Sequence, residues 1–296
     1  MADHQHLAFD GSDIAIGPQT HEHGSDDTVP LAELLDLDGE VLHSYWRDAI
    51  AAVHQAASGA GYVRILDMGA GTGVGTIALA RQFSAAEVIA VDLSEQMLSR
   101  VQSKALELGL DSRIRTVHAD LDVACPALGD IDITWASNSL HHMADPNRTL
   151  REVFSSTRPG GLVAVAEMAE RIRFLPDDIG FGRPGLETRC LDALRSELAH
   201  SLPTLGADWS RLLHTAGFDV LGEQTFTIEL TPPHSPAAAR YAQLWLRRMR
   251  SGLARKLNDD DLQTLAILID DGPESVQQRS DLHIRGTRTL TLGRRQ

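Results

Sequence analysis

The sequence predicts an α/β protein with a doubly wound parallel sheet, and three observations support this fold class. Residues 63–80 read as an apolar strand, a glycine-rich turn and an apolar helix. Short apolar strands follow at 87–92, 114–121, 131–135 and 162–167, with turn signals before them. The chain has 296 residues, which is enough for one large α/β domain with additions.

The first strand ends at Asp67 and leads into the alternating glycines Gly69, Gly71 and Gly73. Such a turn lets the backbone approach a nucleotide-like ligand at a helix N-terminus. The dinucleotide pattern G-x-G-x-x-G is broken, because Val74 occupies the position of its third glycine. The pattern D-x-G-x-G-x-G instead resembles motif I of the class I S-adenosylmethionine-dependent methyltransferases. Asp67 could then pair with the ammonium group of that cofactor, directly or through water.

The second strand, at 87–92, ends in an acid about 20 residues after the first glycine. Asp92 at this spacing suits two hydrogen bonds to ribose hydroxyls. Leu93 is expected beside the adenine, Ser94 is expected to cap the following helix, and Met97 lies in the first turn of that helix.

The third strand, at 114–121, ends near Ala119 and Asp120. The resemblance implies that Asp120 contacts the adenine amino group, flanked by the backbone of Ala119 and Leu121. It thereby implies S-adenosyl-L-methionine as cofactor, S-adenosyl-L-homocysteine as product, and one set of cofactor-binding residues. These are Asp67, Gly69, Ala70, Gly71, Thr72, Gly73, Asp92, Leu93, Met97, Ala119, Asp120, Leu121 and Asn138.

The resemblance covers residues 62–167 well and the C-terminal hairpin moderately, and it implies the rest of the fold. We expect a Rossmann-like, doubly wound, seven-stranded sheet with an antiparallel last strand, plus N-terminal helices and helical inserts. Residues 209–216 read as a helix with Gly217 as its C-cap, and 218–230 and 282–292 read as the two terminal strands.

Three parts are expected along the chain: a flexible arm at 1–28, an N-terminal helical cap at 29–60, and a methyltransferase domain at 61–296. The domain carries an insert at 168–205, which is expected to form a lid over the open ends of the strands. Its second insert, at 232–280, is helical and could cover the pocket or form a homodimer contact.

The fourth strand leads into Asn138 and then His141 and His142, where substrate is expected to meet cofactor. An imidazole can accept a proton at neutral pH, so His141 is our first choice of general base and His142 our second. The alternative is that one imidazole only anchors the loop. Some quinone-biosynthesis O-methyltransferases carry a metal-binding E-x-L-E-H segment here. This chain lacks both carboxylates, and no metal is predicted.

Four residues are substrate-binding candidates. Tyr45 and Trp46 lie on the pre-sheet helix, which covers cofactor and substrate in many members of the resembled family, and core packing is the alternative role for them. Glu167 ends the fifth strand, and Arg171 follows it in the expected lid.

The formal net charge is −14, with 41 acidic against 27 basic residues, which disfavours nucleic acid or an anionic membrane as a partner. The two cysteines form no C-x-x-C pattern, and no apolar run reaches membrane-spanning length. The N-terminus lacks the positive start and apolar core of a signal peptide. We therefore expect a cytoplasmic protein.

The leading interpretation is methyl transfer to O, N or C of a small organic metabolite, plausibly in secondary metabolism. The enzyme alternative is a tRNA or rRNA methyltransferase, which should show a basic patch or an RNA-binding module. A non-catalytic, cofactor-binding regulatory protein of the same fold is a further alternative. A dehydrogenase is disfavoured by Val74 and by Asp67 beside the phosphate position.

Overall fold

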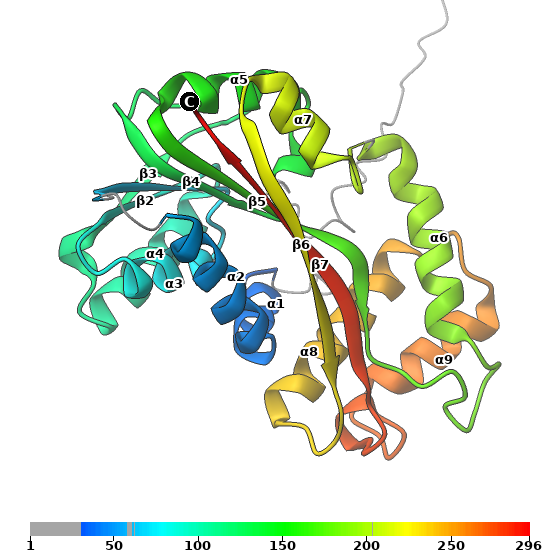
Figure 1. Cartoon of the computed structure of the whole chain (residues 1–296). Coiled ribbons are helices and arrows are strands. Elements are labelled where there is room, and N and C mark those ends of the chain that lie inside the picture. Colours follow the sequence, from blue (N-terminus) through cyan, green and yellow to red (C-terminus); the bar gives the residue numbers. More distant parts are fainter. Residues whose placement is uncertain (1–30, 58–60, 62, 203) are drawn as a thin grey trace, which may run out of the picture.

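The computed structural model describes residues 31–57, 61, 63–202 and 204–296. Their strands form one seven-stranded sheet, which helices flank (Figure 1). The expected arm at 1–28 lies outside the described residues. The strand order is β3-β2-β1-β4-β5-β7-β6, and β7 runs antiparallel to both of its neighbours, as predicted. The strands are β1 (Arg64–Met68), β2 (Glu87–Asp92), β3 (Ile114–His118), β4 (Ile131–Ser137), β5 (Thr157–Arg173), β6 (Asp219–Leu230) and β7 (Ile284–Arg294).

Helices cover both faces of the sheet, with α2, α3 and α4 on one side and α5 and α7 on the other (Figure 1). The central strands are therefore buried on both faces and carry continuous apolar runs. The helices are α1 (Leu31–Val41), α2 (His43–Ala56), α3 (Val74–Gln82), α4 (Glu95–Glu107), α5 (Pro146–Ser156), α6 (Leu186–Ser201), α7 (Trp209–Ala216), α8 (Pro236–Gly252) and α9 (Asp259–Ile269), with short 3₁₀ turns η2 (Asp111–Arg113), η3 (Leu140–His142) and η4 (Val276–Gln278).

Local signals set the helix ends. The Ser94 hydroxyl accepts a hydrogen bond from the Met97 N–H at 3.3 Å, so the predicted cap of α4 is confirmed. Gly217 ends α7 with φ of 106°, as its predicted role as C-cap requires. No helix among the described residues has the length and apolar character needed to cross a membrane.

The fifth strand is longer than the sequence suggested. We expected it to end at Glu167, but β5 continues to Arg173. The reason is that β7 pairs with the added residues, with Glu170 opposite Thr287 and Arg173 opposite Arg285 across two irregularities in register. Arg171 therefore lies on a strand rather than in a loop. Helix α6 begins further along the chain, at Leu186.

A buried polar network joins the N-terminal helices to the C-terminal half of the chain. The carboxylate of Asp38 in α1 accepts hydrogen bonds from Trp46 Nε1 at 3.1 Å and from the Tyr241 hydroxyl at 2.8 Å. It also forms an ion pair with the Arg288 guanidinium of β7, which lies 4.8 Å from the centre of the Tyr45 ring. Asp38 thus connects α1, α2, α8 and the last strand.

Candidate active site

The backbone of the turn after β1 adopts a conformation that requires glycine at three positions. Gly69, Gly71 and Gly73 have φ values of 68°, 51° and 85°, in the left-handed region that disfavours side chains. A Cβ atom on Gly69 would lie 2.6 Å from the Cβ of Ser139. The Gly69 N–H donates to the Val91 carbonyl at 2.8 Å, which ties the turn to β2. The backbone is thus free of side chains at the C-terminal edge of the sheet.

Asp67 lies beneath this turn and is 2% exposed. Its Oδ2 accepts a hydrogen bond from the Thr76 hydroxyl at 2.6 Å, and burial raises the pKa of Asp67 to about 7. The carboxyl therefore contacts the first turn of α3, and its contact with a cofactor ammonium stays a prediction. Sequence reasoning missed Thr76, although a hydroxyl at the start of the helix after a glycine turn was a usable signal.

Asp92 holds the glycine turn in place at the end of β2. Its Oδ2 accepts from the Gly71 N–H at 2.8 Å and its Oδ1 from the Ser94 N–H at 2.9 Å. Burial raises the pKa of Asp92, opposed by these backbone donors. The Asp92 carbonyl accepts from the Ala119 N–H at 3.1 Å, so the ends of β2 and β3 are linked at the predicted positions.

The other residues predicted around the adenine lie near this edge. Leu121 and Met97 are buried, and Leu93 is partly buried. Asp120 is partly buried, and its Oδ1 accepts a hydrogen bond from the Asp122 N–H at 2.8 Å. The structure therefore brings the turn, Asp92 and Asp120 to one edge, while their contacts with adenosine stay predictions.

Asn138 has an unusual backbone at the end of β4. Its φ is 50°, and it is the only residue other than glycine with positive φ among those the structure describes. Its N–H donates to the Ala166 carbonyl of β5 at 2.8 Å. Such a conformation persists only where the surroundings hold it, and such residues cluster at functional sites.

His141, in η3 after β4, and Glu167, within β5, form a buried pair. His141 Nδ1 lies 2.6 Å from Glu167 Oε2, and the two residues are 2% and 3% exposed. An ionised carboxylate only accepts hydrogen bonds, so toward such a group Nδ1 is the donor, and Nε2 is the ring nitrogen left for a further contact. The sequence marked both residues separately, but it gave no signal that they touch.

Two residues, Thr204 and His142, contact His141 and help to hold the η3 segment in place. The Thr204 hydroxyl donates to the His141 carbonyl at 3.1 Å, which links η3 to the segment after α6. The rings of His141 and His142 are 4.1 Å apart, centre to centre. The sequence had no signal for Thr204. Among the described residues, no three His, Cys, Asp or Glu side chains are grouped to hold a metal ion.

The polar side-chain atoms at this edge suit a small polar ligand such as the amino-acid portion of S-adenosyl-L-methionine. Of the six buried side-chain oxygens without a hydrogen-bond partner in the described part of the chain, four lie at this edge. They lie on, or shortly after, the adjacent strands β1, β4 and β5: Thr72 Oγ1, Ser137 Oγ, Asn138 Oδ1 and Glu167 Oε1. Buried polar atoms left in this way need a partner, and a bound ammonium or hydroxyl would supply one.

The aromatic candidates lie in the N-terminal cap. Tyr45 is 5% exposed and packs edge-on against Trp46 and Phe226, at 5.7 Å and 5.5 Å between ring centres. Trp46 is partly buried and lies 6.2 Å from Trp135 of β4. These contacts give both residues a packing role, and their contact with substrate stays a prediction.

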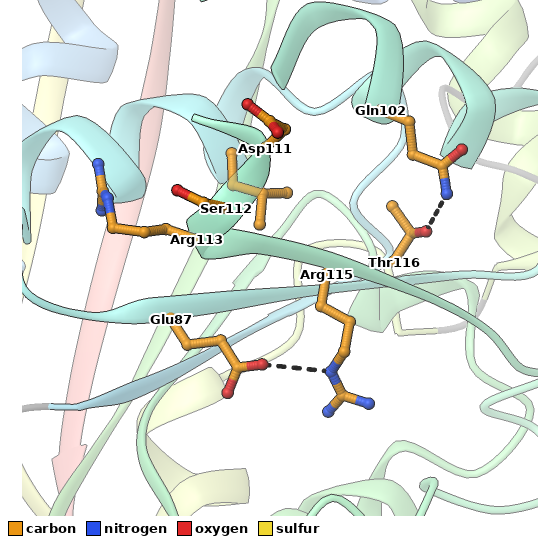
Figure 2. Close-up of a pocket in the computed structure, with 8 residues that line it drawn as sticks. Glu87, Gln102, Asp111, Ser112, Arg113, Arg115 and Thr116 are labelled. Atoms are coloured by element: carbon orange, nitrogen blue, oxygen red, sulfur yellow. Dashed lines mark hydrogen bonds and ion pairs between the residues drawn. The ribbon is translucent and has the colours of Figure 1, made fainter. Parts of the chain in front are cut away.

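A polar pocket at the opposite edge of the sheet is distinct from this site. It is lined by the starts of β2 and β3, and Figure 2 shows Glu87 directed toward Arg115 and Gln102 toward Thr116. The Arg115 Nε to Glu87 Oε1 distance is 3.3 Å. Ligands of open α/β sheets bind outside the carboxyl ends of the strands, so the C-terminal edge is the candidate site.

Comparison with known proteins agrees with this geometry. A methyltransferase domain family matches residues 65–161. Methyltransferase GfsG of Streptomyces halstedii is 30% identical over 208 residues, covering 70% of this chain and 67% of the relative. The 27-O-demethylrifamycin SV methyltransferase of Amycolatopsis mediterranei (strain S699) is 33% identical over 151 residues, which span 46% of this chain and only 55% of that protein.

Among solved structures, a proposed methyltransferase from Bacillus halodurans C-125 superposes with a TM-score of 0.51 at 19% identity. The match covers 83% of this chain and 97% of that one. At this identity the superposition supports the fold alone. Together with the matched sequence family and the S. halstedii relative, it leads to one conclusion. The chain belongs to the class I S-adenosylmethionine-dependent methyltransferases.

Proposed function

We propose that this protein transfers a methyl group from S-adenosyl-L-methionine to a hydroxyl oxygen of a small organic molecule. The observation that carries the proposal is the buried His141–Glu167 pair, with 2.6 Å between Nδ1 and Oε2, beside the cofactor edge. The A. mediterranei relative, named for 27-O-demethylrifamycin SV, supports oxygen as the acceptor. The net charge of −14 supports a small molecule over RNA.

The chain's residues have distinct roles in this proposal. The glycine turn, Asp92, Asp120 and Asn138 would hold the cofactor. When bound, the cofactor supplies a methyl group activated by a positively charged sulfur. His141 Nε2 would accept the proton of the substrate hydroxyl as the hydroxyl oxygen bonds to the methyl carbon. The bond from that carbon to sulfur would break at the same time, and its electron pair would stay on sulfur and cancel the positive charge there. Glu167 orients the imidazole through Nδ1 and stabilises the positive charge that develops on the ring.

Titration calorimetry with S-adenosyl-L-homocysteine and with NAD tests the cofactor. We expect binding of the first ligand only, and binding of NAD alone would contradict the assignment. Transfer of a radiolabelled methyl group to phenols, aliphatic alcohols, amines and bulk tRNA then tests the acceptor. Labelled tRNA without any labelled small molecule would replace our proposal with the RNA alternative.

Three matched variants test the base. We expect His141→Gln to lower kcat by about 10²–10⁴-fold with unchanged affinity for S-adenosyl-L-homocysteine. Glu167→Gln should lower kcat less, because the imidazole remains but loses its charged partner. His142→Gln is the control, with nearly normal kcat. A larger loss in His142→Gln than in His141→Gln would reverse the assignment of the base.

A further inference from the structure

A cavity of about 830 Å³ lies between α6 and the extended ends of β5, β6 and β7. This volume is typical of a site for a small organic ligand. Its floor is formed by residues 168–171 and 173 of β5, 227–229 of β6, and His283 with residues 285–287 at the start of β7. Helix α6 forms the opposite wall. We call it the α6 cavity.

The α6 cavity adjoins the catalytic pair proposed above. Its first β5 residue, Met168, directly follows Glu167 along the strand. Leu205 and Gly206 also line it, and they follow Thr204, whose hydroxyl donates to the His141 carbonyl at 3.1 Å. A ligand in this cavity therefore lies next to the loop that carries His141.

Basic side chains are concentrated around the cavity, although the chain has a net charge of −14. Two of the lining basic residues lie close to acids: His283 Nε2 is 3.5 Å from Glu229, and Arg195 forms an ion pair with Asp192 at 2.9 Å. The lining set contains five basic residues, Arg171, Arg173, Arg195, His283 and Arg285, and two acidic residues, Glu170 and Glu229.

Three of these cations have no carboxylate partner. Within the described part of the chain, Arg171, Arg173 and Arg285 form no ion pair shorter than 4.0 Å. Arg173 Nη1 donates to the Thr188 hydroxyl at 3.2 Å, and Arg285 Nη1 donates to the His283 carbonyl at 3.0 Å. The Glu187 carboxyl accepts the backbone N–H groups of Phe174 and Leu175, which follow β5. Arg285 and Arg173 act to lower the pKa of Glu187, but neither forms an ion pair with it.

Arg171 is the least satisfied of the three. Its Nη1 is buried and has no hydrogen-bond partner among the described residues. The guanidinium lies 6.0 Å from the centre of the Trp245 ring. Burial lowers the pKa of Arg171 to about 10, and the neighbouring Arg248 acts in the same direction. Trp245 and Arg248 belong to α8, which contributes no residue to the cavity lining. Arg171 therefore adds positive charge behind the cavity wall.

The opposite wall is mainly apolar, with Arg195 of α6 as its charged lining residue. Leu191, Leu198, Leu202 and Leu205 line the cavity from α6 and the residues that follow it. One wall therefore suits a hydrocarbon body and the other suits an acid group. This division is the pattern expected of a site for an amphiphilic anion.

We propose that the α6 cavity binds an organic acid, with its carboxylate or phosphate at Arg173 and Arg285 and its hydrocarbon body against the leucines of α6 and of the residues that follow it. This proposal rests on the proposed function, because it names the chemical class of the methyl acceptor. The hydroxyl to be methylated would extend from the cavity toward His141.

Calorimetry with three probes of equal chain length tests the proposal on the full chain: decanoate, decyl phosphate and decanol. We expect at least one of the two acids to bind about tenfold or more tightly than decanol. Comparison of decanoate with decyl phosphate then identifies the acid group. The double variant Arg173→Gln/Arg285→Gln should lose about tenfold in affinity for the preferred acid with little change for decanol.

Arg211→Gln, at an exposed position of α7, is the matched control for the loss of one cation. Equal affinity for acid and alcohol, or an unchanged affinity in the double variant, would overturn the proposal. Binding of S-adenosyl-L-homocysteine is measured on every variant to show that it is folded. A wild-type chain that binds decanoate but not S-adenosyl-L-homocysteine would refute the methyltransferase function and retain the acid site.

Discussion

The ion pair between Asp38 and Arg288 offers the sharpest test of how the N-terminal helices are held. Asp38 is 8% exposed and Arg288 is 1% exposed, so both charges are removed from water. In Asp38→Asn the side chain keeps its shape but leaves the Arg288 guanidinium buried without a counter-charge. The hydrogen bonds from Trp46 and Tyr241 also lose their charged acceptor.

The size of the effect follows from this burial. Breaking one side of a buried ion pair costs about 3–5 kcal/mol of unfolding free energy, because the remaining charge is uncompensated. Arg288→Met should cost a similar amount by leaving the carboxylate unpaired. The double variant removes both charges, so its loss should be smaller than the sum by about 2–3 kcal/mol.

Urea unfolding followed by circular dichroism measures these values for the two single variants and the double variant. Glu40→Gln, at an exposed position of the same helix, is the control for the change of charge, and we expect a loss below about 0.5 kcal/mol. A loss below about 1 kcal/mol in Asp38→Asn, or strictly additive losses in the double variant, would refute the reasoning.

Three further predictions concern buried acids and thiols. Burial raises the pKa of Glu187 from 4.5 to about 7, so the folded state keeps a proton that the unfolded state has lost between these values. Stability should therefore fall as pH rises from about 4.5 to 7, and Glu187→Gln should flatten this fall by about 3 kcal/mol in urea titrations. An equally steep fall in the variant would contradict this. Asp92→Asn should weaken S-adenosyl-L-homocysteine binding by about 1.5–3 kcal/mol in calorimetry, since one amide oxygen cannot replace two carboxylate oxygens, and an unchanged Kd would exclude the role. Burial raises the pKa of Cys125 to about 11, so mass spectrometry should show slow alkylation by iodoacetamide at pH 8 in the folded chain and rapid alkylation in urea. Rapid alkylation of the folded chain would contradict it.

The sheet was predictable because its signals are local. Strands β1, β2 and β4 are short and largely apolar, and each is followed by a turn or cap that depends on nearby sequence. Ser94 and Gly217 act as predicted for this reason. The end of β5 was not predictable, because the added residues are held by β7 more than 100 positions later, as the pairing of Arg173 with Arg285 shows.

The contacts between the residues of the site were harder to predict than the residues themselves. His141 and Glu167 were each identified, but their contact depends on the adjacency of β4 and β5. Asp38 and Arg288 carried a signal that was overlooked. Asp38 lies four positions after Leu34, on the apolar face of its helix. Arg288 shares the alternating inward face of β7 with Ile284 and Leu290. Charged residues at two inward-facing positions indicate a buried pair.

The ion pair between Asp38 and Arg288 spans 250 residues, and this separation affects how the protein matures. Because the ribosome makes the N-terminus first, α1 emerges long before its counter-charge is synthesised. A nascent chain stalled before residue 288 would contain every strand through β6, but its first helix would have no guanidinium to receive Asp38. The complete network around Asp38 can therefore form only after β7 has been synthesised, although α1 and α2 also contact α3, α8 and β6, which are made earlier.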